Sequence, residues 1–407
     1  MRILIYSINY FPELTGIGKY NGEMAQWLAG QGHEVSVITA PPYYPWWRVQ
    51  QPYQSWRYRS EKLDKVNICR CPLWVPRQPS GVKRLLHLFS FALTSIPLLL
   101  LQLLKRPDVL VVLEPTLFCA PVALGVARLS GARTWLHVQD FEVDAALGLG
   151  LVKVKGLGRM AEKIERWLMS GFDRVSSISE NMVGRLVAKG ASGEQCVLLP
   201  NWVDGREIFP VSGANSFRGK LGIGGNICVA LYSGNMGEKQ GLEILLEAAR
   251  LLQDETGLLF VLCGEGAARE RLVHMGENLS NVRWLPLQPL EQLNDLLNLA
   301  DVHLLPQRAD VADLVMPSKL LGMLASGRPV LATAHPGTQL AKVVSSCGRV
   351  VEPGNAGELA QALLELSRAA EQRGRLGWAA RQAAGTWDKT NVLREFEGRL
   401  RVLCGKQ

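Results

Sequence analysis

Two series of short apolar strands, each alternating with helical segments, constrain the fold of this chain more than any other feature. Strand-like runs are expected in the first half at 2–8, 34–39, 108–113, 133–138 and 174–178, and in the second half at 228–232, 258–262, 282–285, 302–305 and 330–333. Strands this apolar must be buried on both faces of their sheet by helices, which is typical of parallel sheets. We therefore expect an α/β protein of two doubly wound, Rossmann-like domains facing a deep interdomain cleft, with ligands beyond the carboxyl ends of the strands.

The length of 407 residues suits two domains of roughly 200 residues, each with its own core. We place these domains at 1–203 and 204–386, and expect an amphipathic helix at 389–403. The eight cysteines form no CxxC pair, and most lie in apolar runs. They are therefore expected to be buried free thiols in a reducing cytoplasm rather than disulfides or zinc ligands.

Positive charge is concentrated in one segment of the first half. The net charge of the chain is +8, and residues 41–84 hold nine Lys and Arg against two acidic residues. This concentration favours an anionic partner surface, and a merely solvated basic surface is the alternative. A nucleic acid is not expected as a partner, because no helix-turn-helix, finger or RNA-binding signature accompanies the charge.

An uncharged stretch of about 20 residues follows at 85–104, long enough to span a bilayer. It could also be a buried helix or a helix lying in the membrane interface. Because the strands before and after it are expected in one sheet, interfacial contact is favoured. Nearby aromatic and basic residues are candidates for contacts with an acceptor or a membrane, although the aromatic ones could equally form a packed loop. These candidates are Tyr43, Tyr44, Trp46, Trp47, Arg57, Arg59, Lys83 and Arg84.

The loop containing Gly16 and Gly18 joins the first strand to a helix expected at 20–29. Glycines at such a position let the backbone approach a ligand, and a helix N-terminus favours negative charge. The loop does not complete a dinucleotide fingerprint, because Asn21 holds the third glycine position and the second strand ends in Thr39 and Ala40. A dehydrogenase is therefore not expected.

His137 and Asp140 lie at the end of the strand expected at 133–138. They could orient a substrate hydroxyl or stabilise charge near a reacting carbon, and a structural histidine is the alternative. Asp140 and Glu142 alone are too few oxygen ligands for a metal ion, so no metal site is expected.

The second half has two candidate phosphate sites. In the segment SGNMGEKQG at 233–241, a glycine-rich turn leads into a helix, with Gly234, Asn235, Lys239 and Gln240 as candidate residues. This arrangement could cradle a diphosphate, with Lys239 supplying the positive charge that magnesium otherwise brings, although a structural turn would look the same. The helix expected at 318–324 starts at a predicted N-cap, Ser318, and Lys319 follows in its first turn. A cation there is unfavourable unless an anion binds nearby, which favours a functional role for Lys319.

A series of motifs in the chain resembles the family 4 retaining glycosyltransferases. In chain order, these motifs are the glycine-rich first loop, the HxxD segment at 137–140, PNWVD at 200–204, SGNMGEKQG, CGEG at 263–266 and MPSKLLGMLASGRPV at 316–330. The details are most similar to the subgroup of colanic-acid biosynthesis. The resemblance implies a GT-B fold, with acceptor contacts mainly in the N-terminal domain and the donor nucleotide mainly in the C-terminal domain. It also implies that the terminal segment, 387–407, packs back on the N-terminal domain.

By the same resemblance, His137 would lie beside the transferred sugar, Gly16 and Gly18 over the donor phosphates, and Glu265 and Gly266 beside the nucleotide. The sequence departs from the family at two points. Asn235 and Gln240 stand where the family commonly has Arg and Lys, and neither Leu314 nor Gly322 supplies the usual pair of glutamates. Asp310 or Asp313 could serve the ribose or sugar hydroxyls instead.

The expected activity is therefore transfer of a hexose with retention, with fucose from GDP-fucose as the specific candidate. The acceptor would be a polyprenyl diphosphate-linked sugar in exopolysaccharide biosynthesis, and neither a metal ion nor a cofactor is expected. The protein would be cytoplasmic and peripheral on the cytoplasmic face of the inner membrane. Two alternatives remain open: a nucleotide-sugar 2-epimerase of the same fold, and a catalytically silent partner in an exopolysaccharide assembly complex.

Overall fold

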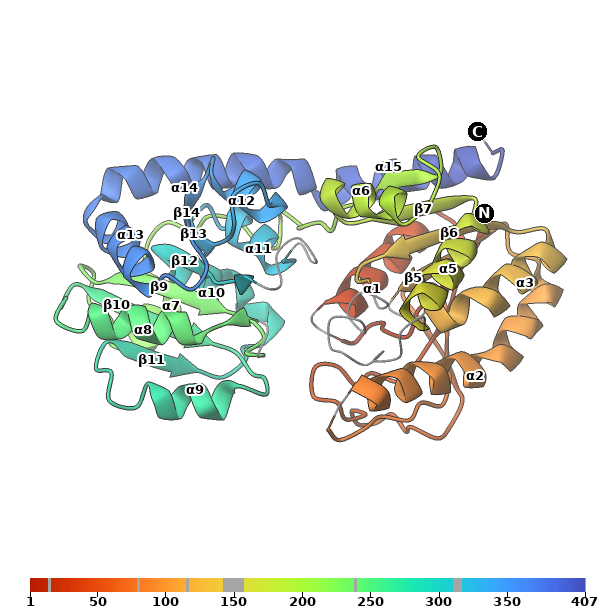
Figure 1. The fold of residues 1–407 in the computed structure, drawn as a ribbon, viewed down its shortest axis with the longest axis horizontal. Coiled ribbons are helices and arrows are strands. Elements are labelled where there is room, and N and C mark those ends of the chain that lie inside the picture. Colours follow the sequence, from red (N-terminus) through yellow and green to blue (C-terminus); the bar gives the residue numbers. More distant parts are fainter. Residues whose placement is uncertain are drawn as a thin grey trace. The chain divides into compact units, whose positions relative to one another are not determined.

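The computed structural model describes residues 1–13, 16–78, 81–114, 117–141, 157–237, 240–309 and 317–406. The chain divides into two compact units, each built of a sheet with helices on both faces (Figure 1). Unit 1 comprises Met1–Pro200 and Val392–Gln407, and unit 2 comprises Asn201–Asn391. The prediction of two doubly wound α/β units is confirmed.

Within the described residues, the sheet of unit 1 has eight strands in the order β3-β4-β2-β1-β5-β6-β7-β8. All neighbouring strands are parallel except β3 and β4. The strands are β1 (Arg2–Tyr6), β2 (Glu34–Thr39), β3 (Arg59–Leu63), β4 (Val66–Arg70), β5 (Val109–Glu114), β6 (Arg133–Val138), β7 (Arg174–Ser177) and β8 (Cys196–Leu198).

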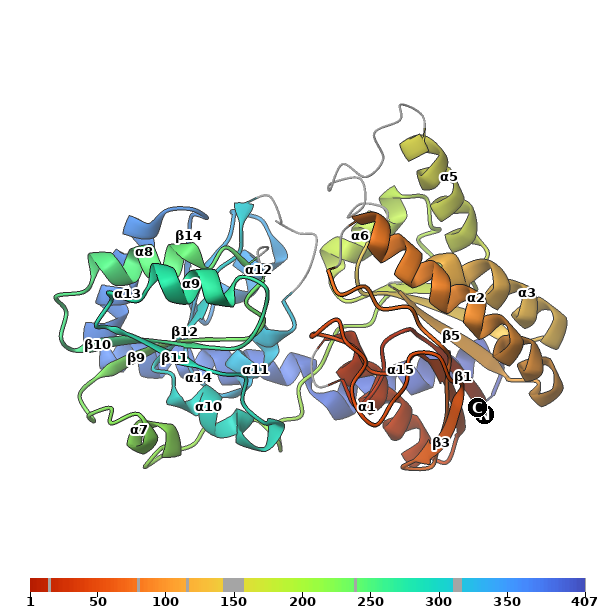
Figure 2. The ribbon, with the colours of Figure 1, turned by 90° about the horizontal axis from the view of Figure 1, so that it is seen from below.

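The helices of unit 1 cover both faces of this sheet. They are α1 (Ile17–Gly30), α2 (Gly81–Lys105), α3 (Ala120–Ser130), α5 (Leu157–Ser170), α6 (Glu180–Ala188) and, at the C-terminus, α15 (Lys389–Leu403). Helices α1 and α15 lie on one face, and α2 and α3 on the other (Figure 2). On the first face, the ring of Trp135 is 5.1 Å from that of Phe396 in α15. On the second, the ring of Tyr6 is 5.6 Å from that of Phe91 in α2.

One edge of the first sheet contains a hairpin that the sequence analysis did not predict. Strands β3 and β4 form an antiparallel hairpin, whose turn places Asp64 and Lys65 at φ 48° and 68°. Strand β3 is mostly exposed and carries three charged residues among five. Charged side chains are typical of edge strands, because they discourage pairing with other chains. In the sequence, however, these charges make β3 difficult to distinguish from the basic segment around it.

Helix α2 contains the uncharged stretch 85–104 and packs on the sheet through Phe91, Ser95 and Leu99. It is long and apolar enough to cross a bilayer, the one such helix within the described ranges. However, the strands that precede and follow it, β4 and β5, belong to the same sheet. Because a membrane span would separate these strands, α2 is a covering helix of unit 1 with an exposed apolar outer side.

The sheet of unit 2 has six parallel strands among the described residues, in the order β11-β10-β9-β12-β13-β14. The strands are β9 (Cys228–Ser233), β10 (Leu258–Cys263), β11 (Val282–Leu285), β12 (Val302–Leu305), β13 (Val330–Thr333) and β14 (Gly348–Val351). Helices α8 and α13 pack together, as do α11 and α14. The helices are α7 (Ser216–Lys220), α8 (Glu243–Leu251), α9 (Arg269–Met275), α10 (Leu293–Leu299), α11 (Lys319–Ala325), α12 (Gln339–Val344), α13 (Ala356–Arg368) and α14 (Ala370–Ala384).

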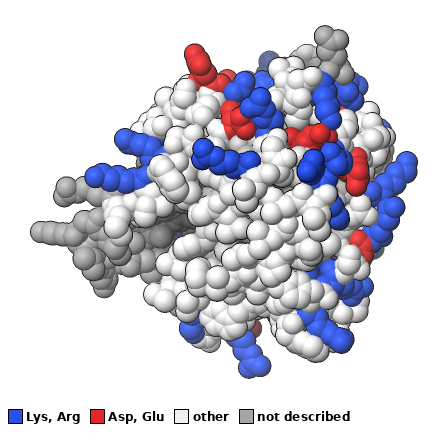
Figure 3. All heavy atoms as spheres, turned by 90° about the vertical axis from the view of Figure 1, so that its right-hand side faces the viewer, with Lys and Arg blue, Asp and Glu red and all other residues white. Residues whose placement is uncertain are grey.

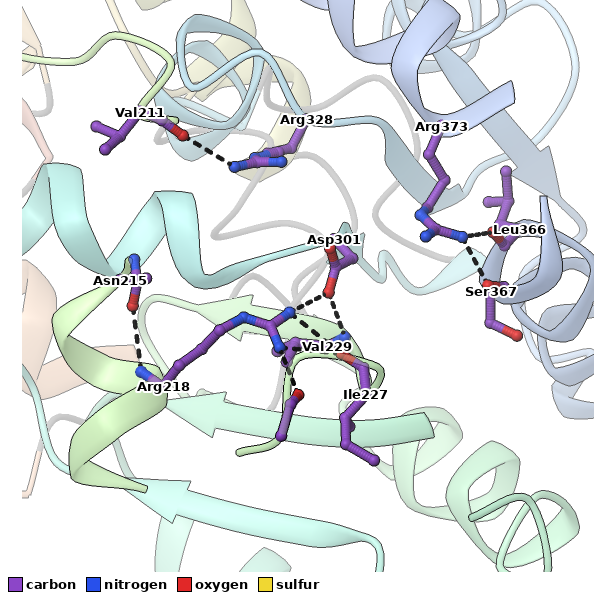
Figure 4. A network of polar contacts seen from close by, with 11 residues as sticks. Val211, Asn215, Arg218, Ile227, Val229, Asp301, Arg328, Leu366, Ser367 and Arg373 are labelled. Atoms are coloured by element: carbon purple, nitrogen blue, oxygen red, sulfur yellow. Dashed lines mark hydrogen bonds and ion pairs between the residues drawn. The ribbon is translucent and has the colours of Figure 1, made fainter. Parts of the chain in front are cut away.

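A polar network holds the amino ends of β9 and β12 (Figure 4). The Asp301 carboxylate accepts hydrogen bonds from Arg218 Nη2 at 2.6 Å and from the Val229 backbone N–H at 2.8 Å. The network lies at the amino edge of the sheet, whereas the glycine-rich loops that follow the parallel strands β9 and β10 lie at the opposite, carboxyl edge.

Candidate functional site

The loops that follow β9 and β10 are joined at the carboxyl edge of the unit 2 sheet. Gly234 N–H donates to the Cys263 carbonyl at 3.0 Å, and Met236 N–H donates to the Glu265 carbonyl at 2.8 Å. The Tyr232 hydroxyl donates to the Asn235 carbonyl at 2.6 Å. These bonds hold the first loop in a fixed turn beside the second.

Glycine is required where the two loops touch. A Cβ atom at Gly264 would lie 1.9 Å from the Gly234 carbonyl oxygen, and one at Gly266 would lie 2.5 Å from that of Met236. Both glycines also have positive φ, at 149° and 153°, where other residues are strained. The structure thus brings together four predicted donor residues, Gly234, Asn235, Glu265 and Gly266.

Lys319 reaches this turn from the first residue of α11. Its Nζ lies 4.1 Å from the centroid of the Tyr232 ring, and a Cβ atom at Gly234 would lie 3.3 Å from its Cδ. Burial lowers the pKa of the Lys319 ammonium to about 7. Within the described part of the chain, no carboxylate forms an ion pair with it. An anion bound at the turn would supply the missing charge and favour the protonated lysine.

Ser318 occupies the N-cap position of α11, as predicted, but it does not act as a capping residue. Its backbone is already helical, at φ −59° and ψ −27°, and its side chain makes no capping hydrogen bond. An N-cap residue normally has extended backbone dihedrals, which turn its side chain toward the free N–H groups. Ser318 therefore leaves the first N–H groups of α11 without a side-chain acceptor from the cap position.

The remaining candidates of the second half fall into three groups. Lys239, Asp310 and Asp313 lie outside the described residues. Gln240 is present beside the turn, and its buried Oε1 has no hydrogen-bond partner within the described ranges. Gly322 faces α10, where a Cβ atom would lie 3.2 Å from Leu297 Cδ1. The Cβ atom of a glutamate at this position would therefore lie in the apolar contact between α11 and α10.

In unit 1, helix α1 begins at Ile17, three residues earlier than predicted. Gly16 therefore occupies the N-cap position with φ 65°, and Gly18 lies in the first helical turn rather than in the loop. A Cβ atom at Gly18 would lie 2.6 Å from Glu13 Oε2. The absence of a side chain at Gly18 thus makes room for the Glu13 carboxyl group.

Glu13 links two of the candidate segments of unit 1, and the sequence analysis missed it. Its side chain is buried and accepts hydrogen bonds from Asn9 Nδ2 at 2.9 Å and from the Tyr43 and Tyr44 N–H groups at 3.1 Å each. Burial raises the pKa of Glu13 to about 7 despite these bonds. Glu13 thereby ties the first loop to the aromatic segment at 43–47. No motif marks it, since its partners come together only in the fold.

His137 lies within β6 and is 1% exposed. Its Nδ1 is 2.9 Å from Ser176 Oγ, and burial lowers its pKa to about 3, so the imidazole is neutral at physiological pH. It can exchange a hydrogen bond but carries no charge. Asp140 follows the carboxyl end of the same strand and is partly exposed. The burial of His137 suits a structural role, while its strand end is where ligands bind in such sheets.

The residues predicted to contact an acceptor or a membrane lie in several places on unit 1. Tyr43 is buried, with its ring 5.6 Å from that of Trp47 and 4.6 Å from that of His87. Tyr44 is only partly buried, and its ring lies beside Gly16. The exposed ones are Trp46, Arg57, Arg59, Lys83 and Arg84, of which Arg84 lies over the Trp47 ring and Arg57 over the Trp56 ring.

No group of three or more His, Cys, Asp or Glu side chains is placed to hold a metal ion in the ranges that the structure describes. The eight cysteines are free thiols.

Comparisons with known proteins agree on one family. Residues 15–202 match the glycosyl transferase 4-like domain, and residues 228–369 match the glycosyl transferases group 1 domain. The chain is 46% identical over 407 residues to WcaI of Escherichia coli (strain K12), a protein assigned to colanic acid biosynthesis as a glycosyl transferase, and the match covers 97% of this chain and 98% of that protein.

Solved structures share the fold at low sequence identity. A sucrose-phosphate synthase from Thermosynechococcus elongatus superposes with a TM-score of 0.78 at 16% identity, covering 98% of both chains. The Anabaena protein HepE, in complex with UDP, superposes with a TM-score of 0.70 at 14% identity, covering 99% of this chain and 100% of that one.

Proposed function

Since the chain belongs to the glycosyltransferase family that joins a glycosyl transferase 4-like domain to a group 1 domain, we propose that it transfers a hexose from a nucleotide sugar to a polyprenyl diphosphate-linked sugar in exopolysaccharide biosynthesis. The assignment of its relative WcaI to colanic acid biosynthesis supports a colanic-acid-like product. The complex of HepE with UDP supports a nucleoside diphosphate as the departing group.

The observation that carries the proposal is the position of Lys319 against the turn at Gly234. The Gly234 and Met236 N–H groups bond the neighbouring loop and fix the turn, and Lys319 places against it a buried cation whose pKa its surroundings lower to about 7. A preorganised cation of this kind stabilises the charge that develops on a departing diphosphate. We therefore assign the donor diphosphate to the joined loops of β9 and β10, with Lys319 as its main electrostatic partner and with no metal ion required.

The proposed reaction retains the configuration of the anomeric carbon. The bond from that carbon to the diphosphate oxygen breaks, and a bond to the acceptor hydroxyl oxygen forms on the same face. The acceptor proton passes to an oxygen of the departing diphosphate. Lys319 then stabilises the leaving group without taking part in the proton transfer. GDP-fucose is the donor that the likeness to colanic acid biosynthesis favours.

We further propose that the enzyme works in the cytoplasm, held on the inner membrane through unit 1. The outer side of α2 exposes Leu86, Phe89, Leu93, Leu100 and Leu101. Figure 3 shows the right-hand side of the Figure 1 view, where a broad surface without charged residues is surrounded mainly by Lys and Arg and by a few Asp and Glu. An apolar helix face with a basic surround fits an interface with anionic headgroups.

The test is transfer from labelled nucleotide sugars to a lipid extract of exopolysaccharide-producing cells, with EDTA present. We expect label in the lipid phase with one donor, and its loss with Lys319→Met. Conversion of the nucleotide sugar in water with no lipid product would instead indicate a 2-epimerase. Absence of both products would indicate a catalytically silent partner.

A further inference from the structure

Three tryptophans and two arginines line an open groove on unit 1, which we call the tryptophan groove. Its named residues are Trp46, Trp47, Trp74, Arg48 and Arg77, and its volume is about 700 Å³. That volume lies within the range of roughly 300–1,000 Å³ that ligand pockets occupy. Trp46 and Trp74 are about half exposed, at 48% and 46%, so their rings are accessible to a ligand.

The groove is fixed to the start of α2 by hydrogen bonds and ring contacts. His87 donates from Nδ1 to the Trp74 carbonyl at 2.7 Å, and the Trp74 N–H donates to Ser90 Oγ at 3.2 Å. The His87 ring also lies 5.3 Å from that of Trp47. Because one helix holds both tryptophans, the walls of the groove are built before any ligand arrives.

The positive charge of the groove is uncompensated. Neither Arg48 nor Arg77 forms an ion pair with any residue that the structure describes, and no acidic residue lines the groove. The two acidic residues of the segment 41–84 are engaged elsewhere, Glu61 with Arg59 and Arg70, and Asp64 with Gln26. Two guanidinium groups without carboxylates favour an anion such as a phosphate, which arginine binds with two hydrogen bonds at once.

The residues of α2 that hold Trp74 are flanked along the helix by exposed apolar side chains. Leu86 precedes His87, and Phe89 precedes Ser90. A ligand bound by the arginines can therefore place an apolar chain on the tryptophans and on the outer side of α2. A ligand with a charged head and a long apolar tail matches both features, whereas a free nucleotide matches only the first.

We propose that the tryptophan groove binds the lipid diphosphate portion of the acceptor, an inference that rests on the proposed function. Arg48 and Arg77 hold the diphosphate oxygens, and Trp46 and Trp74 contact the first isoprene units. The groove thereby recognises both the diphosphate and the isoprenoid chain of the lipid. This recognition is separate from that of the sugar that receives the hexose.

Calorimetric titration of the full chain with farnesyl diphosphate tests this proposal. We expect binding at least tenfold tighter than that of inorganic diphosphate or of farnesol, because each supplies only one of the two contacts. Arg48→Ala with Arg77→Ala should weaken farnesyl diphosphate binding at least tenfold, since hydrogen bonds to charged groups are lost. Trp74→Phe should weaken it less than Trp74→Ala.

The matched control is Trp378→Ala with Arg375→Ala. This pair is also an exposed tryptophan and an exposed arginine, but both lie on α14 of unit 2 and neither lines the groove. It should leave farnesyl diphosphate binding unchanged. All variants should keep the thermal shift caused by a nucleoside diphosphate, which shows that they fold and that the donor site is intact.

Equal losses in the groove and control variants, or unchanged binding in the groove variants, would overturn the proposal. The proposal would also be overturned if Arg48 and Arg77 were needed to bind phosphatidylglycerol vesicles while farnesyl diphosphate did not bind. The groove would then recognise bulk lipid headgroups. Farnesyl diphosphate binding that depends on the groove, in a chain that binds no nucleoside diphosphate, would uphold the groove and refute the proposed transfer.

Discussion

The Lys319 ammonium lies 4.1 Å from the Tyr232 ring, and this contact links the start of α11 to the end of β9. The pKa of the lysine is lowered to about 7 because the ammonium is buried without a carboxylate partner in the described part of the chain. The aromatic face supplies part of the stabilisation that a cation needs. A diphosphate in the adjoining turn would supply the rest.

Removal of this cation should slow transfer strongly. We expect Lys319→Met to lower kcat/KM at least about 100-fold, because a preorganised charge at a leaving group contributes about 100- to 1,000-fold. Lys342→Met is the matched control, since Lys342 is an exposed lysine of α12 in the same unit. Initial rates with the preferred donor would measure both. Equal rates for the two variants would remove Lys319 from the mechanism.

Nucleoside diphosphate binding should be coupled to proton uptake. Above pH 7 the free protein holds Lys319 largely neutral, and a bound diphosphate raises its pKa toward the ordinary value of about 10.4. Calorimetric titrations at pH 8 in buffers of different ionisation enthalpy should therefore reveal net uptake of up to one proton. The uptake should vanish in Lys319→Met. Proton release, or uptake that persists in the variant, would contradict this assignment.

The contact of the β9 and β10 loops should tolerate no side chain. Gly266→Ala would place a Cβ atom 2.5 Å from the Met236 carbonyl oxygen, at a φ of 153°. We expect it to destabilise unit 2 by about 1–3 kcal/mol and to weaken donor binding. Gly225→Ala is the control, because a Cβ atom there has no neighbour within 4 Å. Thermal unfolding of both variants would show whether the loops adapt instead.

Glu13 should make unit 1 less stable as the pH rises from about 5 to 8. Its folded pKa of about 7 exceeds its ordinary value, so the folded state binds more protons than the unfolded state across this window. Stability from this group is present below the ordinary pKa and is lost as the pH rises through 7. Glu13→Gln should reduce that loss, measured by denaturant midpoints, whereas Glu34→Gln, at an exposed position, should not.

Membrane association should depend on both charge and salt. Neutralising Arg57, Arg59, Lys83 and Arg84 should lower co-sedimentation with anionic vesicles severalfold, because basic residues near such a surface contribute about 1 kcal/mol each. High salt should weaken binding of the unaltered protein in the same way. Recovery of the unaltered protein entirely in the supernatant at low salt would contradict the proposed membrane contact.

The sequence predicted the α/β architecture well because burial on both faces leaves a strong local signal. Strands β2, β6, β11, β12 and β13 have the predicted bounds. The β3–β4 hairpin was missed because the exposed, charged residues of β3 resemble a solvated loop. The start of α1 was placed three residues late, since glycines at 16 and 18 indicated a loop although Gly18 is helical.

The candidate site could be predicted only in part. The glycine-rich turns predicted the close contact of the loops after β9 and β10, because glycine at closely spaced positions indicates tight backbone contacts. The approach of Lys319 to Tyr232 depends on the packing of α11 beside β9, which no local pattern encodes. Glu13 and Trp74 were missed for the same reason, since their importance comes from partners far along the chain, Tyr43 and His87.

The central claim is that a nucleoside diphosphate binds the joined loops of unit 2 against Lys319. Thermal unfolding with GDP, UDP, ADP and dTDP in the presence of EDTA tests it most directly, because a ligand of the folded state raises Tm. The account predicts that one of the four raises Tm and that Lys319→Met abolishes the shift while Lys342→Met retains it. A shift that is unchanged in Lys319→Met, or no shift with any of the four, would contradict it.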